Sequence, residues 1–249
     1  MGSGQTAQQT LVDHLAELRN RLIYSFVAIM VSSLATFVFS DVFFDLVRGP
    51  VVEFLPTGGL IFTSPMDKFV AHVKLSMVAG VICSCPVWLY NIWMFIAPAL
   101  YSHERKYAAL FVGSGVALFI AGVCFSYFLV LPSAFQFLFS FGGDVDRPMI
   151  TISDYMSFFT TMTLVFGVAF ELPLVLIALG ALGLLSAQIL REKRRYAIVA
   201  LAVVSAVVTP PDILSMVMLL VPLMVLYEIS ILFIAAIERK KVQAASPSI

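Results

Sequence analysis

The sequence predicts an all-α, polytopic membrane protein with six transmembrane helices in a curved, concave arrangement and both termini in the cytoplasm. Three observations predict it: the composition, continuous apolar runs, and an uneven distribution of Lys and Arg between them. Apolar residues make up 61% of the 249 residues and charged residues only 12%, with a mean hydropathy of +1.00. A soluble domain carries about 45–50% apolar residues and about 25% charged residues. Because a soluble fold needs a polar exterior, soluble enzymes, nucleic-acid-binding proteins and disordered chains are excluded.

Six runs are long and nearly free of charge, as a transmembrane helix of about 20 residues requires. They are residues 22–40, 75–103, 107–143, 155–190, 196–211 and 213–237. Their apolar character is continuous, which differs from the alternation of a membrane β-barrel strand. We expect the third helix to stop near Leu131 and Pro132, and the other prolines, at 86, 98, 173 and 222, to bend or end their helices.

The fifth run predicts an unusually short helix. Pro210 and Pro211 must end it, which leaves 13 residues from Tyr196 to Val208. At 1.5 Å per residue such a helix spans only about 20 Å, against a hydrocarbon core of about 30 Å. We therefore expect the bilayer to thin around it, or partners to cover its ends.

The basic residues predict the orientation. With the N-terminus inside, 11 Lys and Arg fall in inside regions and 4 in outside regions, which puts both termini in the cytoplasm. The chain then forms one membrane domain over 1–249, with an amphipathic cytoplasmic segment at 1–21 and a flexible tail at 242–249. The outside holds two long loops, 41–68 and 132–154, and the punctuation at Gly49 and Pro50 predicts an ordered, turning loop.

The search for catalytic and cofactor motifs is negative. No lysine follows a nucleotide-binding glycine loop, and the three histidines, at 14, 72 and 103, lack metal-ligand spacing. Cys83, Cys85 and Cys124 lie in apolar runs, which favours packing over disulfides. We expect no enzymatic activity, cofactor, metal or nucleic-acid partner.

Two acids lie on the predicted cytoplasmic face. Glu17 belongs to a segment whose leucines, at 15, 18 and 22, recur at helical spacing, and Glu104 lies between the second and third runs. Each acid has a neighbouring arginine, so both could be ordinary surface ion pairs. Alternatively, two carboxylates on one membrane face form a receptor for a basic ligand, because carboxylates bind guanidinium groups in bidentate fashion.

Two further acids lie within apolar runs. Glu171 is near the middle of the fourth run, where an ionisable group costs about 2.5–3.5 kcal/mol to insert. It either serves a function or makes an internal hydrogen bond, to a threonine at 160, 161 or 163 or to another helix. Glu228 lies closer to the cytoplasmic end, and we interpret it as structural.

Five segments in order resemble the TatC family, the core receptor subunit of the twin-arginine protein translocase. They are 14–22, 95–105, 166–173, 191–196 and 209–212. The resemblance covers about residues 11–240. It implies a multi-pass protein of the cell inner membrane that binds the twin-arginine signal peptides of folded precursors. It also implies assembly with TatA, TatB and further copies of itself among membrane lipids, with transport driven by the proton motive force.

The resemblance also implies roles for particular residues. Those matched to signal-peptide binding are Glu17, Arg19, Phe95, Glu104 and Arg105. Glu171 matches a contact with a partner's transmembrane helix. Pro50, Lys74 and Asp212 match loop positions with structural and functional importance.

Several alternatives stay open at this point. Phe95 could be a lipid-facing or core aromatic, and Asp212 with Thr209 is also typical of a turn cap. A small-solute transporter that uses Glu171 for proton coupling is a rival function, although the chain shows no convincing internal repeat. A membrane scaffold without a ligand is a third.

Overall fold

A computed structural model describes residues 3–52, 59–100, 105–140, 149–209 and 212–245. These ranges are overwhelmingly helical, which confirms the all-α prediction. The helices are α1 (Ser3–Val38), α2 (Ser40–Val52), α3 (Pro65–Cys83), α4 (Cys85–Leu100), α5 (Arg105–Phe125), α6 (Leu131–Ser140), α7 (Ile152–Ala169), α8 (Leu172–Ala181), α9 (Ala187–Glu192), α10 (Arg194–Val208) and α11 (Ile213–Ala245).

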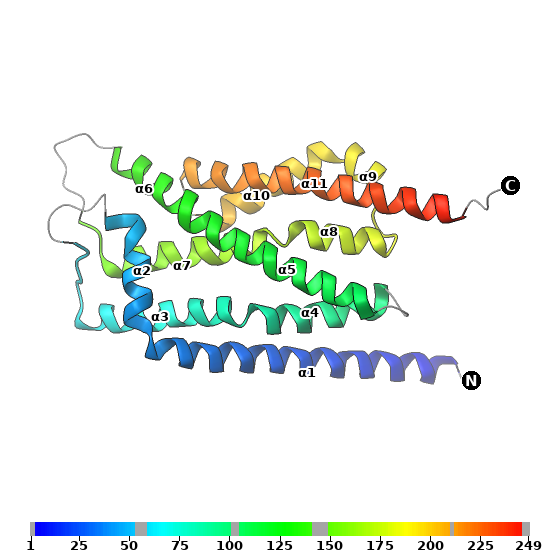
Figure 1. The fold of residues 1–249 in the computed structure, drawn as a ribbon, viewed down its shortest axis with the longest axis horizontal. Helices are drawn as coiled ribbons and strands as arrows, with labels where there is room; N and C mark the ends of the chain where they lie inside the picture. The colour runs from blue at the N-terminus through cyan, green and yellow to red at the C-terminus, as the bar shows by residue number, and fades with distance from the viewer. Residues whose placement is uncertain (1–2, 53–58, 101–104, 141–148, 210–211, 246–249) are drawn as a thin grey trace.

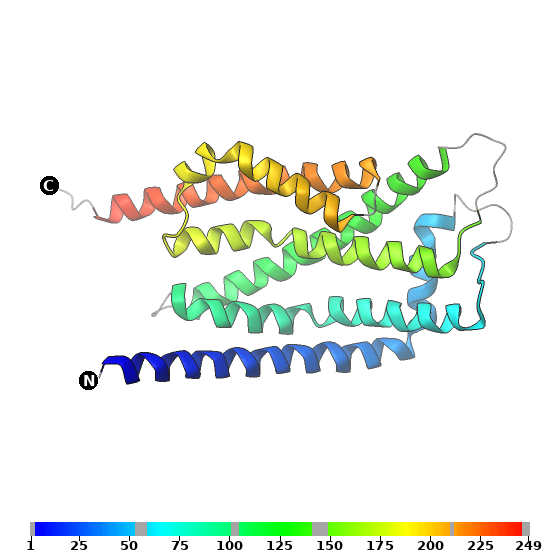
Figure 2. The same ribbon diagram turned by 180° about the vertical axis from the view of Figure 1, so that it is seen from behind.

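The long helices run side by side along one axis (Figures 1 and 2). Within the described ranges, four helical stretches are long and apolar enough to cross a membrane, and the bent pair α3 and α4 would be a fifth. The short helix predicted at 196–208 is α10, with 15 residues and a length of about 22 Å. A count of six spans therefore stays a prediction, with α10 as the incomplete one.

Both ends of the chain lie at one end of the bundle. The first turns of α1 and the last turns of α11 lie at this end on opposite sides of the bundle, whereas α2 crosses the other end (Figure 1). The predicted 1–21 segment is not a separate helix, because α1 continues unbroken into the first apolar run. Residues 242–245 of the predicted tail are the last residues of α11.

Two helix breaks occur next to prolines, as predicted, and the first of them is also a sharp bend. Ser84 separates α3 from α4, whose axes differ by 55°, and Pro86 follows at the start of α4. Phe170 and Glu171 separate α7 from α8, which begins with Pro173 in its first turn. In both places the proline lies where its missing N–H removes no interior hydrogen bond. In contrast, α11 passes Pro222 as one helix.

The predicted helix end near Leu131 and Pro132 is wrong. A π-helical turn, Ser126–Val130, follows α5, and α6 continues to Ser140. The Leu131 N–H donates to the Ser126 carbonyl, five residues back. The wider turn places Pro132 in a new first turn, where a proline is tolerated.

The fourth apolar run, 155–190, does not form a helix over its whole length. Helix α8 ends at Ala181, and Gly183 then adopts a φ of +76° that an L side chain rarely allows. The chain turns there and forms the short helix α9, which lies beside α11. Residues 187–192 therefore belong to an end of the bundle and do not extend a span.

The opposite end of the bundle carries an ordered cap, which consists of α2 and of residues 59–64 and 149–151 in the two connections. Gly49 and Pro50, predicted as a turn, lie inside α2. A β-bridge joins the two connections, with the Ile61 N–H donating to the Ile150 carbonyl at 3.0 Å and the Ile152 N–H to the Ile61 carbonyl at 2.8 Å. Ser64, with Asp67, caps α3, and Thr151 caps α7.

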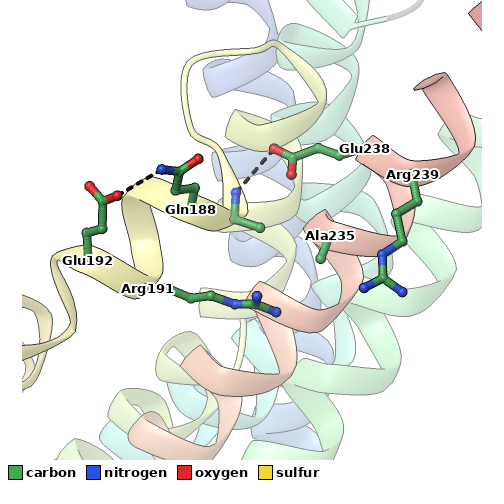
Figure 3. A pocket seen from close by; sticks show the side chains of 7 residues that line it. Gln188, Arg191, Glu192, Ala235, Glu238 and Arg239 are labelled. Carbon is green, nitrogen blue, oxygen red and sulfur yellow. Dashed lines mark hydrogen bonds between the residues drawn. The ribbon is translucent and has the colours of Figure 1, made fainter.

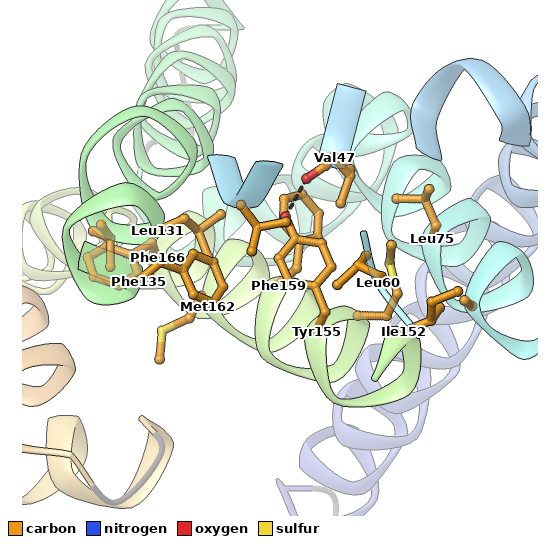
Figure 4. Close-up of a cluster of buried hydrophobic side chains, with 14 of the residues drawn as sticks. Val47, Leu60, Leu75, Leu131, Phe135, Ile152, Tyr155, Phe159, Met162 and Phe166 are labelled. Carbon is orange, nitrogen blue, oxygen red and sulfur yellow. Dashed lines mark hydrogen bonds between the residues drawn. The ribbon is translucent and has the colours of Figure 1, made fainter. Parts of the chain in front are cut away.

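A buried apolar cluster joins this cap to the helices (Figure 4). The Tyr155 hydroxyl donates to the carbonyl of Val47 in α2. Leu131 and Phe135 of α6 pack in the same cluster as Phe159 and Phe166 of α7. The cap is therefore part of the hydrophobic core.

Glycines set the closest helix crossings. A Cβ at Gly80 of α3 would overlap the backbone of Ser33 in α1, and one at Gly122 of α5 would overlap Phe166 in α7. Small residues allow helix backbones to approach closely in membranes, where van der Waals packing drives association. These contacts hold α1 beside α3 and α5 beside α7.

Candidate functional site

The first candidate site is a groove between α4 and the middle of α1. It encloses about 490 Å³ and is lined from α1 by Ala16, Glu17, Asn20, Arg21 and Tyr24 and from α4 by Asn91. The spacing of Glu17, Arg21 and Tyr24 places these side chains on one face of α1. That face is turned toward α4, so a carboxylate points into the groove.

The Glu17 carboxylate is held by Arg21 but not enclosed. The Arg21 Nε and Nη2 atoms both donate to Glu17 Oε1, at 2.9 and 2.5 Å. Among the described residues, nothing donates to Oε2, and the Glu17 side chain is 40% exposed. The ion pair expected for Glu17 is therefore present, yet it orients the carboxylate and leaves one oxygen open.

Of the other residues predicted for this site, Phe95 lies on the helix face that lines the groove and Arg19 does not. Phe95 is half-buried on α4, one turn beyond Asn91 and on the same face. Arg19 is exposed and lies about 200° around α1 from Glu17, so it does not line the groove. Glu104 lies outside the described residues. Arg105 begins α5, and its side chain is not described.

Sequence reasoning missed Asn91 as a member of the groove. Asn91 is buried, and its Nδ2 donates to the Val87 carbonyl at 2.9 Å. A lone amide within an apolar run was the signal for it, because polar groups at membrane depth are costly.

The second candidate site surrounds Glu171, at the break between α7 and α8. The side chain is buried, and within the described part of the chain neither carboxylate oxygen has a hydrogen-bond partner. The internal hydrogen bond that was considered for Glu171 is therefore absent from the described contacts.

Trp93 of α4 and Gly115 of α5 complete the Glu171 site. A Cβ at Gly115 would lie 3.3 Å from Glu171 Oε2 and 3.4 Å from Trp93 Nε1. The indole N–H is also buried without a described partner. An acceptor and a donor thus flank one glycine, and both are available to a polar group that enters between the helices.

The remaining predicted positions have structural contacts or lie beside them. The Lys74 ammonium donates to the Ser157 hydroxyl at 3.0 Å, which links α3 to α7. Asp212 accepts from the Ser215 N–H at 2.6 Å and so caps α11. Pro50 lies in α2, where the Tyr127 hydroxyl donates to the Leu46 carbonyl four residues before it, at 2.8 Å.

Glu228 has the structural role expected for it. Its carboxylate accepts from the Arg194 guanidinium at 2.6 Å, which joins α11 to the start of α10. Both side chains are about half exposed. Among the described residues, no group of three or more His, Cys, Asp or Glu side chains could hold a metal ion.

Comparison with known proteins agrees with this architecture. The family model described as Sec-independent protein translocase protein (TatC) matches residues 13–222. The TatC protein of Desulforapulum autotrophicum is 37% identical over 240 residues, which are 96% of this chain and 89% of that protein. TatC of Escherichia coli K12 is 38% identical over 226 residues, covering 90% and 88%.

A solved structure agrees as well. The crystal structure of the twin-arginine translocase receptor TatC in the detergent DDM superposes with a TM-score of 0.80 at 38% identity. The match covers 88% of this chain and 98% of that one. The family match, the identity over nearly the full length and the shared fold therefore establish that this chain belongs to the TatC family of Sec-independent protein translocase components.

Proposed function

We propose that this chain is the receptor of the twin-arginine translocase, which binds the signal peptides of folded precursors and nucleates assembly with TatA and TatB. It acts in the inner membrane, with both termini in the cytoplasm, alongside further copies of itself. The proton motive force drives transport. The name of the solved relative, a twin-arginine translocase receptor, supports the receptor role.

One observation carries the signal-binding part of the proposal. Glu17 lines the groove between α1 and α4, with Oε1 bonded to Arg21 and Oε2 open among the described contacts. A guanidinium from a signal peptide donates to Oε2 and shares the carboxylate with Arg21. Charge-assisted hydrogen bonds of this kind are about twice as strong as neutral ones.

The second acid and the aromatic extend this site along α4. The helix leads from Asn91 past Phe95 to Leu100, toward the connection that contains Glu104. We propose that Glu104 receives the second signal arginine, that Phe95 packs against the signal, and that Arg105 and Arg19 adjust the surrounding charge. Each signal arginine then has one carboxylate as its hydrogen-bond acceptor.

Glu171 belongs to the assembly step of the proposal. A carboxylate and an indole N–H without described partners give a polar side chain of a TatA or TatB helix both an acceptor and a donor. Hydrogen bonds between helices hold membrane proteins together where the hydrophobic effect does not. Pro50, Lys74 and Asp212 maintain the cap and the helix ends around which the complex forms.

Binding of a signal peptide to the purified chain tests the proposal. A peptide with the arginine pair should bind, and the same peptide with two lysines should bind at least tenfold more weakly, because lysine lacks the bidentate fork. Glu17→Gln and Glu104→Gln should each weaken binding of the arginine peptide. Equal affinity for both peptides would reject the receptor function.

Glu192→Gln is the matched control. It also removes one carboxylate, but Glu192 accepts from Gln188 on α9 and lies outside the α1–α4 groove. Signal binding should be unchanged. An equal loss in Glu192→Gln and Glu17→Gln would mean that net charge, rather than the groove, attracts the peptide.

A further inference from the structure

A second polar groove lies at the terminal end of the bundle, far along the chain from Glu17. It forms where the short helix α9 runs beside the last turns of α11, and it encloses about 600 Å³ (Figure 3). Ala187 and Ala235 form small apolar parts of its wall. The turn at Gly183 creates it, since that turn brings α9 back beside α11.

Two arginines of this groove have no partner among the residues that the structure describes. Arg191 extends from α9 toward α11, and Arg239 extends from α11 one turn beyond Ala235 (Figure 3). Both are exposed, and neither makes a hydrogen bond or ion pair with any described residue. Arg21 and Arg194 are instead paired with carboxylates. The groove therefore presents two guanidinium groups that are free to bind an anion.

Both acids of the groove already accept a hydrogen bond from a neighbouring residue. Glu238 Oε1 accepts from the Ala187 N–H at 3.2 Å, and Glu192 Oε1 accepts from Gln188 Nε2 at 2.9 Å. The two segments that build the groove, 187–195 and 235–241, contain seven Lys and Arg against these two acids. The lining itself holds two arginines and two acids, and the excess of basic residues lies in the rest of the two segments. Their positive charge favours the approach of an anionic ligand, which Arg191 and Arg239 can then bind.

An exposed apolar strip continues from the groove along α11. Leu232 and Val225 lie 7 and 14 residues before Arg239 and so share its face of the helix. Leu232 is 63% exposed and Val225 54%. A ligand that fits both parts has an anionic head for the arginines and a hydrocarbon chain for the strip.

We propose that the groove between α9 and α11 binds the phosphodiester of an anionic membrane phospholipid through Arg191 and Arg239, with an acyl chain along Leu232 and Val225. Guanidinium groups match phosphate oxygens in bidentate geometry. The basic end of a membrane protein faces the anionic cytoplasmic leaflet. Basic pockets between helices on that side bind phospholipid head groups. The site anchors α9 and α11 to the leaflet, independently of the Glu17 groove.

Native mass spectrometry of the full-length chain in an uncharged detergent tests this proposal. Phosphatidylglycerol should bind at least tenfold more tightly than phosphatidylcholine. Arg191→Gln with Arg239→Gln should weaken phosphatidylglycerol binding about 25-fold, because each basic residue contributes about fivefold. Equal binding of the two lipids, or displacement of phosphatidylglycerol by millimolar inorganic phosphate, would overturn the lipid assignment.

Lys193→Gln with Arg195→Gln is the matched control. It also removes two positive charges, both from the segment that contains Arg191, but both side chains lie near the Tyr196 ring, with Lys193 Nζ and Arg195 Cζ each 5.5 Å from its centroid, outside the groove. Phosphatidylglycerol binding should fall less than about threefold. A loss equal to that of the groove variant would refute a defined site.

Arg191→Lys with Arg239→Lys is a second variant, which tests whether weaker binding comes from the lost guanidinium groups or from misfolding. It keeps both charges but removes the planar donors, so binding should fall about fivefold while the melting temperature stays the same. Full affinity in this variant would show that charge alone attracts the lipid and would reject the phosphate geometry.

Discussion

The hydroxyl of Tyr127 compensates for a hydrogen bond that Pro50 cannot make. Pro50 lies inside α2 and has no N–H for the carbonyl of Leu46, four residues before it. The Tyr127 hydroxyl, from the π-helical turn after α5, donates to that carbonyl at 2.8 Å. Gly49 leaves room for it, since a Cβ there would lie 3.1 Å from the hydroxyl. We predict that Tyr127→Phe destabilises the cap through this bond alone.

The expected magnitude follows from the type of bond. Hydrogen bonds in membrane proteins contribute about 0.6 kcal/mol on average and up to about 1.7. An acceptor left without a partner costs about 1–3 kcal/mol when buried. Because Tyr127 is only partly buried, we expect a loss of about 1 kcal/mol. For a chain of this size that lowers the melting temperature by about 2–4 °C.

A double-mutant cycle in detergent separates this bond from other effects. In a Pro50→Ala background, residue 50 regains an N–H that can donate to Leu46, so Tyr127→Phe should then change the melting temperature by less than about 1 °C. An equal shift in both backgrounds would refute the reasoning, because it would show that Tyr127 stabilises the cap by packing and not by replacing the missing bond.

Three other predictions concern the helices, each measured by thermal melting in detergent. Glu171→Leu should raise the stability by about 2 kcal/mol while impairing translocation, because it removes a buried carboxylate without a described partner; a loss of stability would show that the carboxylate has one. Gly122→Ala should lower the stability by about 1–3 kcal/mol, because the added Cβ meets the backbone of α7. Gly113→Ala, where the added Cβ has open space, should leave the stability unchanged or raise it. Equal effects of the two substitutions would contradict the close crossing at Gly122. Glu228→Gln should cost at most about 1 kcal/mol, since its pair with Arg194 is half exposed, and the cost should shrink in high salt; a larger, salt-independent cost would indicate a buried network.

Local chemistry explains why much of the fold was predictable. Continuous apolar runs locate the helices, and Pro86 and Pro173 locate two helix breaks, because a missing N–H acts within one turn. Pro132, in contrast, does not end the third helix, although the same reasoning predicted that it would. The π-helical turn before it places Pro132 in the first turn of α6, where a proline is tolerated. Sequence spacing alone does not indicate such a turn.

The candidate sites were predictable only in part. Glu17 and Glu171 are evident from the sequence because carboxylates are rare in such an apolar chain. Asn91 as the opposite wall of the groove, and Trp93 and Gly115 beside Glu171, depend on which faces of α4 meet α1 and α5. Contacts between helices decide those faces, and such contacts join residues far apart in the chain.

The sequence by itself determined that the chain is an all-α membrane protein, which residues are costly at membrane depth, and which family it resembles, because composition and local motifs carry that information. Only the tertiary structure decided that Arg21 holds one oxygen of Glu17, that Arg19 points elsewhere, and that Arg191 and Arg239 share a groove. The physical reason is that charge and burial become specific interactions only after the helices pack, and packing depends on contacts between distant residues.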